Sequence, residues 1–187
     1  MYPLRIVPFS VDRADIVSWI YQGLRSTFDI IIENLPVDYD STFNQERNQY
    51  NSTALIHCLL NHYPDKGAKV LGVTSLDLHI PILTFVFGEA QLDGTVAVVS
   101  SYRLKPEFYG LPHDDALLAE RLVKESFHEL GHTFGLVHCP YYECVMHSST
   151  YVEEIDLKRP AFCPECQKTF EKKNDQPPYY SPAAANE

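Results

Sequence analysis

Hydrophobic residues in the first part of the chain follow two spacings, one typical of strands and one typical of helices. Residues 3–9 and 30–35 are short apolar runs that predict strands, and the second is rich in β-branched residues. Residues 12–28 and 52–63 each contain a segment with apolar residues at helical spacing. The order strand, helix, strand at the start of the chain predicts a parallel βαβ unit.

Three further strand-like runs follow Gly67. They span residues 69–78, 82–90 and 95–104. Asp93-Gly94 lies between the last two runs and is a strong signal for a hairpin turn. We therefore expect residues 84–90 to run antiparallel to the strand that follows. The sheet is predicted to be mixed, with one antiparallel edge strand.

The longest helical pattern begins at Asp114, a favourable N-cap residue, and ends at Phe134, with Gly135 as its natural stop. Its apolar stripe comprises Ala116, Ala119, Val123, Phe127, Leu130 and Phe134. The opposite side carries Arg121, Glu125, His128 and His132. One face of this helix is therefore expected to pack on a core, while the other presents the histidines.

The chain changes character after His138, where Cys, Tyr and Pro become frequent. A short helix is predicted over residues 152–159 and another after Pro164. Residues 174–187 form a low-complexity tail with no pattern able to bury itself. Together with the mixed sheet, these features predict a single domain of the α/β (α+β) class over residues 1–187.

The composition limits the kinds of partner that we expect. The 187 residues are 45% hydrophobic, enough for a core, and the formal net charge is -10. An acidic surface repels phosphate backbones and anionic membranes, so neither nucleic acid nor a membrane is expected as a partner. The first residues lack the pattern of a signal peptide, and no apolar run approaches the length of a membrane span. We therefore expect a cytoplasmic protein.

The segment HELGHTFGLVHC carries the candidate catalytic chemistry. On a helix, His128 and His132 lie one turn apart on one face, the spacing at which two imidazoles can bind a single metal ion. Gly135 allows an abrupt exit from the helix, so that His138 can return as the third ligand and leave the fourth position to water. Glu129 lies between the first two histidines, suited to act as general base towards a zinc-activated water in the hydrolysis of a peptide bond.

Single histidines usually satisfy local hydrogen bonds, and H-E-x-x-H alone occurs by chance. The added glycine and third histidine favour the metal site, because five fixed residues at this spacing co-occur in such a chain with a probability on the order of 10⁻⁴ or less. The sequence therefore predicts a catalytic zinc ion at the three histidines.

Four of the five cysteines fall within twenty-eight consecutive residues. Cys139 and Cys144 form one pair and Cys163 and Cys166 another, which is the arrangement of a closed tetrahedral site for a structural zinc ion. Burial alone does not explain this clustering, and a redox role for the C-x-x-C pair lacks the βαβ context that such motifs need. We therefore expect two zinc ions per chain, with the adjacent His138 and Cys139 bound to different ions.

The combined string resembles the archaemetzincins, a family of zinc metallopeptidases in the metzincin clan. HELGHTFGLVHC is followed by PYYE, then CVM, a loop and CPEC. Upstream, DLHIPILTFVFGEA, AVVSSYRL and RNQYNS also resemble family sequence, so the likeness covers the chain apart from the tail. The loop from Met146 to Cys163 is one residue shorter than the family's pattern, which affects the expected shape of the loop rather than metal binding.

The resemblance implies a metzincin-like fold. Residues 1–135 would form an upper subdomain, with a mixed twisted sheet backed by helices and the active-site helix, and residues 136–173 a small lower subdomain organised by the structural zinc. Met146 would form the methionine turn that supports the histidines from below. Residues 84–90 would lie along the cleft, where a peptide adds as a further strand. The implied activity is zinc-dependent hydrolysis of a peptide or protein substrate, and we expect a monomer.

Other kinds of function stay open from the sequence. A zinc-dependent binding or regulatory protein with a metzincin fold would have little turnover, although binding alone does not need Glu129. The cysteines could instead form a zinc-ribbon module that binds nucleic acid or a partner. The net negative charge of the chain argues against this alternative. The tail, which contains PPYYSP, is a smaller hypothesis: it would lie in the cleft as a pseudo-substrate.

Overall fold

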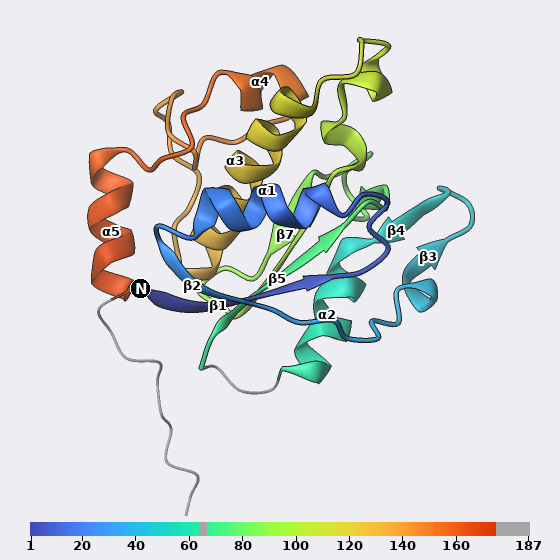
Figure 1. The fold of residues 1–187 in the computed structure, drawn as a ribbon, viewed down its shortest axis with the longest axis horizontal. Helices are drawn as coiled ribbons and strands as arrows, with labels where there is room; N and C mark the ends of the chain where they lie inside the picture. The colour runs from blue at the N-terminus through green and yellow to red at the C-terminus, as the bar shows by residue number, and fades with distance from the viewer. Residues whose placement is uncertain (64–66, 175–187) are drawn as a thin grey trace, which may run out of the picture.

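Five strands form the central sheet of the computed structural model, which describes residues 1–63 and 67–174 (Figure 1). Their order across the sheet is β2-β1-β5-β8-β7. The strands are β1 (Tyr2–Pro8), β2 (Phe28–Ile32), β5 (Lys69–Thr74), β7 (Gly88–Ala90) and β8 (Val96–Ser100). Four of them are parallel, and β7 runs antiparallel to β8 at one edge. The predicted mixed sheet with an antiparallel edge strand is confirmed.

Two strands differ in extent from their predictions. β2 begins at Phe28, before the predicted start, because the buried Phe28 pairs with β1, and it ends at Ile32 with its last residues exposed at the sheet edge. β7 contains only the last three residues of the predicted segment 84–90. Just before β7, Phe87 still accepts a hydrogen bond from Ser100 of β8, whereas Val86 forms a bridge with Leu78. A pattern of apolar residues does not reveal which of two neighbouring strands a segment will pair with.

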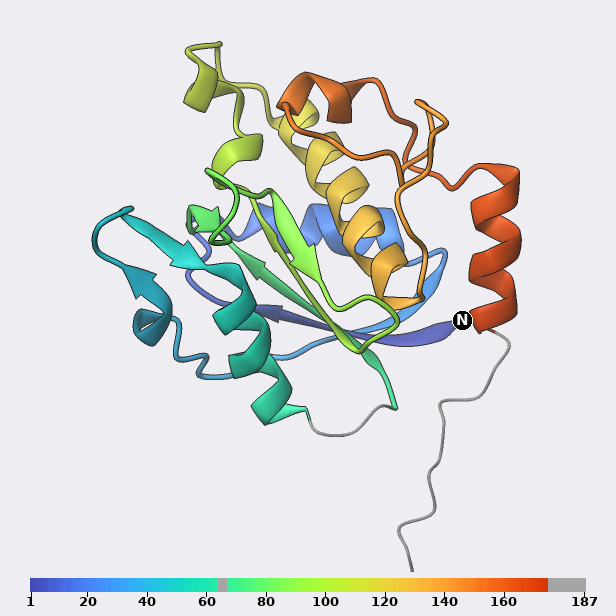
Figure 2. The same cartoon turned by 180° about the vertical axis from the view of Figure 1, so that it is seen from behind.

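Helices cover both faces of the sheet (Figures 1 and 2). α1 (Asp15–Leu24) and α3 (Asp115–Thr133) pack on one face, where they share a core with Leu71 and Val73 of β5. α2 (Ser52–His62) packs on the other face against Val70. Because successive residues of a strand point to opposite faces, a strand covered on both sides is apolar throughout, which explains the continuous runs seen in the sequence.

A second, small sheet lies beside α2. It consists of β3 (Phe43–Asn44), β4 (Gln49–Asn51) and β6 (Leu78–His79), in the order β3-β4-β6. Arg47 in the β3–β4 turn donates to the carbonyl oxygens of Ile80 at 3.1 Å and Leu83 at 2.7 Å, and Gln49 donates to that of Thr84 at 3.0 Å. The small sheet therefore fixes the segment that leads into β7. Three short 3₁₀ helices complete this part of the fold, at Asp40–Thr42, Tyr102–Leu104 and Pro106–Tyr109.

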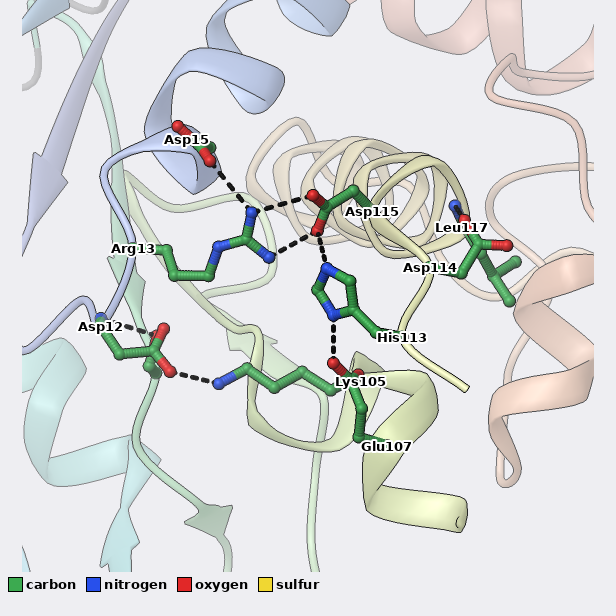
Figure 3. Close-up of polar contacts among 10 residues, drawn as sticks. Asp12, Arg13, Asp15, Lys105, Glu107, His113, Asp114, Asp115 and Leu117 are labelled. Carbon is green, nitrogen blue, oxygen red and sulfur yellow. Dashed lines mark hydrogen bonds and ion pairs between the residues drawn. The ribbon is translucent and has the colours of Figure 1, made fainter. Parts of the chain in front are cut away.

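The start of α3 is tied to the start of α1. Asp114 caps the helix as predicted, with its carboxylate accepting from the amide of Leu117 at 3.0 Å. The next residue, Asp115, accepts two hydrogen bonds from the guanidinium of Arg13, and it also contacts His113 at 2.9 Å (Figure 3). Bidentate pairs of this kind fix orientation as well as distance. The helix that carries the histidines is therefore anchored at its first turn.

The end of α3 is closed by the β7–β8 turn. Gly135 has a φ of 81°, a conformation that glycine adopts without steric cost, so the predicted stop is confirmed. Asp93 in the turn donates its amide to the carbonyl of His132 at 2.9 Å, and Lys69 donates to the carbonyl of Thr133 at 2.7 Å. These donors satisfy carbonyl groups that the last turn of a helix leaves free.

The second half of α3 is buried all around, which the predicted apolar stripe did not indicate. Residues 124–131 are all buried because the chain that follows α3 covers the side away from the sheet. At the other end the predicted stripe was wrong: Ala116 is exposed and Ala119 half-buried, while Leu118 and Leu122 contribute to the core. The positions of apolar residues around a helix do not show which later segment will cover its polar side.

The chain after α3 adds α4 (Val152–Asp156) and α5 (Pro164–Asn174). Phe170 of α5 packs against the rings of Phe28 and Phe134, which places α5 next to the amino terminus (Figure 1). The division into residues 1–135 and 136–173 stays a prediction. Most of the predicted tail, residues 175–187, lies outside the described residues. Within residues 1–63 and 67–174, no helix is long and apolar enough to cross a bilayer.

Candidate metal centres

Three histidines converge at the end of α3. His128 and His132 lie on successive turns, and the exit at Gly135 brings back His138, as the sequence predicts. The Nε2 atoms of His128 and His132 are 3.1 Å apart, and one ring nitrogen of each of the three residues lies within 4.8 Å of the others. Tetrahedral zinc with Zn–N bonds of about 2.0–2.1 Å needs ligand atoms about 3.4 Å apart. The triad is therefore close to the geometry that a zinc ion needs.

The outer nitrogens of two of these histidines contact backbone carbonyls. His128 Nδ1 lies 2.8 Å from the oxygen of Val145, and His132 Nδ1 lies 2.7 Å from that of Leu136. A carbonyl oxygen only accepts, so we assign the proton to Nδ1 in both rings, which leaves the Nε2 lone pairs free for a metal. Burial lowers the pKa of both residues and of His138. Neutral imidazoles with free Nε2 atoms are the form that binds zinc.

The side chain of Glu129 extends from α3 towards the edge strand β7. This side chain is buried and forms part of the wall of the cavity described below. A Cβ atom at Gly88 would lie 2.7 Å from Cγ of Glu129 and 2.7 Å from the carbonyl oxygen of Val98. Only glycine permits this close approach of β7 to the carboxylate. Burial, followed by the nearby Glu125 and Glu89, raises the pKa of Glu129 well above its ordinary value.

Met146 is fully buried against Gly131 of α3, which lies between His128 and His132 in the sequence. A Cβ atom at Gly131 would lie 2.4 Å from the Met146 sulfur, well inside van der Waals contact. The sequence singles out the methionine but gives no role to the glycine in the middle of HELGH. A glycine inside a helix costs about 1 kcal/mol relative to alanine. A glycine at this position therefore indicates that another group packs closely against the helix there.

We expect Gly131→Ala to destabilise the protein by about 1–3 kcal/mol despite the better helix propensity of alanine, because the added methyl group overpacks a filled site. The free energy of unfolding in urea measures the effect. Gly67→Ala is the matched control, since a Cβ atom there meets nothing within 4 Å. A Gly131→Ala protein as stable as the wild type would contradict the packing described for Met146.

A cavity of about 620 Å³ opens over the three histidines. Its wall contains Ile80, residues 83–90 and Leu92, together with four residues of α3 and residues 137–138 and 148–151. The α3 residues in the wall are Glu125, His128, Glu129 and His132. Most of the remaining wall is apolar, so the cavity is suited to an extended ligand with side chains on both sides of the histidines.

The four predicted cysteines form a second cluster, with all four sulfur atoms within 4.8 Å of one another. Cys139 and Cys163 have their sulfur atoms 3.8 Å apart, which matches the edge of a tetrahedron with Zn–S bonds of about 2.3 Å. A hydrogen bond from the backbone of Cys166 is the main cause that lowers the pKa of Cys163 to about 7. Burial raises the pKa of Cys144 and of Cys166.

The two clusters are joined through the backbone. Cys139 follows His138 directly, and its amide donates to the carbonyl of Met146 at 2.9 Å. The residue before Met146, Val145, provides the carbonyl that contacts His128. The segment that brings the cysteines together thus also orients a histidine of the triad.

Several buried polar residues around the triad were not identified as functional from the sequence. Arg121 is buried in a bidentate pair with Asp156, both bonds measuring 2.7 Å. Lys158 is a buried cation whose Nζ has no hydrogen-bond partner in the part of the chain that the structure describes. Glu125 and Ser149 also carry buried oxygen atoms without a partner there. The positions of these groups depend on α4 packing beside α3, which no local pattern predicts.

Comparison with known proteins gives a consistent result. The sequence model of Peptidase family M54 matches residues 27–172. The archaemetzincin of Pyrococcus furiosus is 39% identical over 176 residues, which cover 90% of this chain and 92% of that protein. The crystal structure of archaemetzincin from Methanopyrus kandleri matches with a TM-score of 0.80 at 36% identity, over 94% of this chain and 96% of that one.

A second solved structure supports the same conclusion. The archaemetzincin of Archaeoglobus fulgidus, complexed with malonate, matches with a TM-score of 0.77 at 34% identity, over 89% of this chain and 99% of that one. The predicted fold, a mixed sheet backed by helices with a histidine triad on α3, is thereby confirmed. By sequence and by fold, the chain belongs to the archaemetzincins, the zinc metallopeptidases of peptidase family M54.

Proposed function

We propose that this chain hydrolyses peptide bonds with a zinc ion held by His128, His132 and His138 and with Glu129 as general base. The four cysteines would hold a second zinc ion that stabilises the fold. The single observation that carries the proposal is the buried carboxylate of Glu129, which lines the cavity together with the three clustered histidines. A site that only bound a ligand would not need a base there.

Each residue has a specific task in this proposal. A zinc ion at the triad would supply Lewis-acid chemistry, by lowering the pKa of water and polarising the scissile carbonyl. Glu129 accepts the proton of the attacking water on its carboxylate and passes it to the departing amine. Val145 and Leu136, through their carbonyls, keep two of the imidazoles in the tautomer that binds metal.

The open edge of β7 supports an extended peptide as the substrate. In the antiparallel pair of β7 and β8, the carbonyl of Phe87 accepts from Ser100 and the amide of Gln91 donates to Val96. Because bonded positions alternate along such a pair, the backbone groups of Gly88 and Ala90 point away from β8, towards the open edge. A peptide strand that adds there passes next to Glu129.

The proposal is tested by incubating the zinc-loaded protein with a degenerate peptide library and identifying new termini by mass spectrometry. Cleavage that disappears in Glu129→Gln supports it. A zinc-loaded wild type that cleaves no peptide would favour the alternative, a zinc-dependent binding or regulatory protein with a metzincin fold.

A further inference from the structure

Three carboxylates line the cavity, and one of them, Glu125, has an oxygen atom without a hydrogen-bond partner among the described residues and no role in the proposed reaction. Glu89 accepts hydrogen bonds from Ser52 and Thr53 at the start of α2. Glu129 is the proposed base. Glu125 is only 5% exposed, and its Oε2 atom is buried without a hydrogen bond to any described residue. A buried carboxylate left in this state is costly unless a ligand supplies the missing partner.

Two other buried polar groups also lack a hydrogen-bond partner among the described residues. Ser149 lines the cavity and has a buried hydroxyl oxygen without a partner among the described residues. Lys158 is buried, is not part of the cavity wall, and its strongest favourable charge interaction is with Glu125. Burial raises the pKa of the Glu125 carboxyl, and Lys158 opposes that rise. The wall of the cavity therefore presents two buried oxygen atoms without hydrogen-bond partners among the described residues, and Lys158 partly offsets the effect of burial on the Glu125 carboxyl.

The direction of β7 indicates which part of a substrate would meet Glu125. Gly88 lies beside Glu129, and Asp93 further along the chain contacts His132, so β7 and α3 run in the same sense. A peptide that adds antiparallel to β7 then runs from the His132 end of the cavity to the Glu125 end. Glu125 precedes Glu129 by one helical turn, about 6 Å along the axis.

The segment that contains Ser149 lies at the same end. Residues 148–151 lead into α4, and Asp156 of α4 bonds to Arg121 and Lys124 in the first half of α3. In this antiparallel orientation, the substrate residue that follows the scissile bond is the one directed to Glu125 and Ser149.

We propose that Glu125, together with Ser149, binds the cationic end of a lysine or arginine side chain immediately after the scissile bond. This inference rests on the proposed peptidase function and names its substrate class. The aliphatic part of such a side chain would pack against Phe85 and Tyr151, which line the cavity. An apolar side chain would bury the carboxylate without a partner, and an acidic one would meet a like charge.

The test uses two hydroxamates, HONH–CO–CH₂–CH(R)–CO–NHCH₃, in which R is the side chain of lysine or its uncharged isostere norleucine. A hydroxamate chelates zinc, and the attached group R then enters the subsite after the scissile bond. Binding to the full, zinc-loaded chain is measured by calorimetry. We expect the lysine compound to bind about tenfold more tightly or better, since hydrogen bonds to a charged group contribute roughly 1.5–3 kcal/mol.

Glu125→Gln is expected to abolish this preference, and Ser149→Ala to reduce it about threefold, which provides a second variant if the first is unstable. Glu153→Gln is the control, because it removes the same charge from an exposed position on α4. Equal binding of the two compounds to the wild type, tighter binding of the norleucine compound, or an unchanged preference in Glu125→Gln would overturn the proposal. A wild type that prefers the lysine compound but cleaves no peptide would contradict hydrolysis and leave the assignment of Glu125 supported.

Discussion

Glu129→Gln is expected to lower kcat for peptide hydrolysis by about 10²- to 10⁴-fold, the range over which general bases contribute. Glutamine has nearly the same shape, so it should fit between α3 and Gly88 as the glutamate does. It cannot accept the proton of the attacking water. The carboxylate is not one of the proposed ligands, so both zinc ions should stay bound. Measuring kcat and zinc content on the same sample separates lost chemistry from lost metal.

The control for this variant is Glu120→Gln on the same helix. Glu120 is exposed and pairs with Lys124 rather than with any cavity group. Its replacement should leave kcat within about twofold, because Glu120 lies outside the cavity and a glutamine oxygen can still accept a hydrogen bond from Lys124. If Glu129→Gln kept more than about a tenth of the wild-type kcat, another group would have to act as the base.

Cys163→Ser should remove the second zinc ion and with it much of the folding free energy. Structural zinc contributes about 10 kcal/mol or more in small metal-dependent domains, as much as the whole stability of an ordinary protein. The four sulfur atoms lie within 4.8 Å of one another and leave no position for water, so three ligands would be a poor substitute. We expect a mostly insoluble protein, with less than one zinc per chain in any soluble fraction.

The loss should extend to the catalytic site because the two clusters share their backbone. Cys139 is held to Met146, and the neighbouring Val145 orients His128. Cys58→Ser is the matched control, since Cys58 lies in α2 and is not part of the cluster. A soluble Cys163→Ser protein with full zinc content at the histidines would show that the sites are independent.

The parts of the fold that depend on residues close together in the sequence could be predicted. Asp114 and Gly135 bound α3 because caps act within one turn, and the H-E-x-x-H spacing places two imidazoles on one face of any helix. The Asp93-Gly94 turn correctly predicted the antiparallel pair. Each of these signals is local, so tertiary packing did not change it.

What the sequence did not reveal depends on contacts between distant segments. β3 and β6 are two residues long, too short for any periodic signal. Gly88 and Gly131 are explained only by the side chains that face them, Glu129 and Met146. From the sequence, Glu125 and Lys158 would be expected on the solvated surface, but both are buried because α4 covers that side of α3. Such positions are fixed by packing, which one sequence does not encode in a local pattern.

We expect the adjacent residues His138 and Cys139 to bind two different zinc ions. Counting zinc per chain in the wild type and in His128→Ala tests this, with replacement of His57, an exposed histidine of α2, by alanine as the control. We expect about two zinc ions in the wild type and the control, and about one in His128→Ala, because only the histidine site loses a ligand. Retention of two zinc ions by His128→Ala would contradict it.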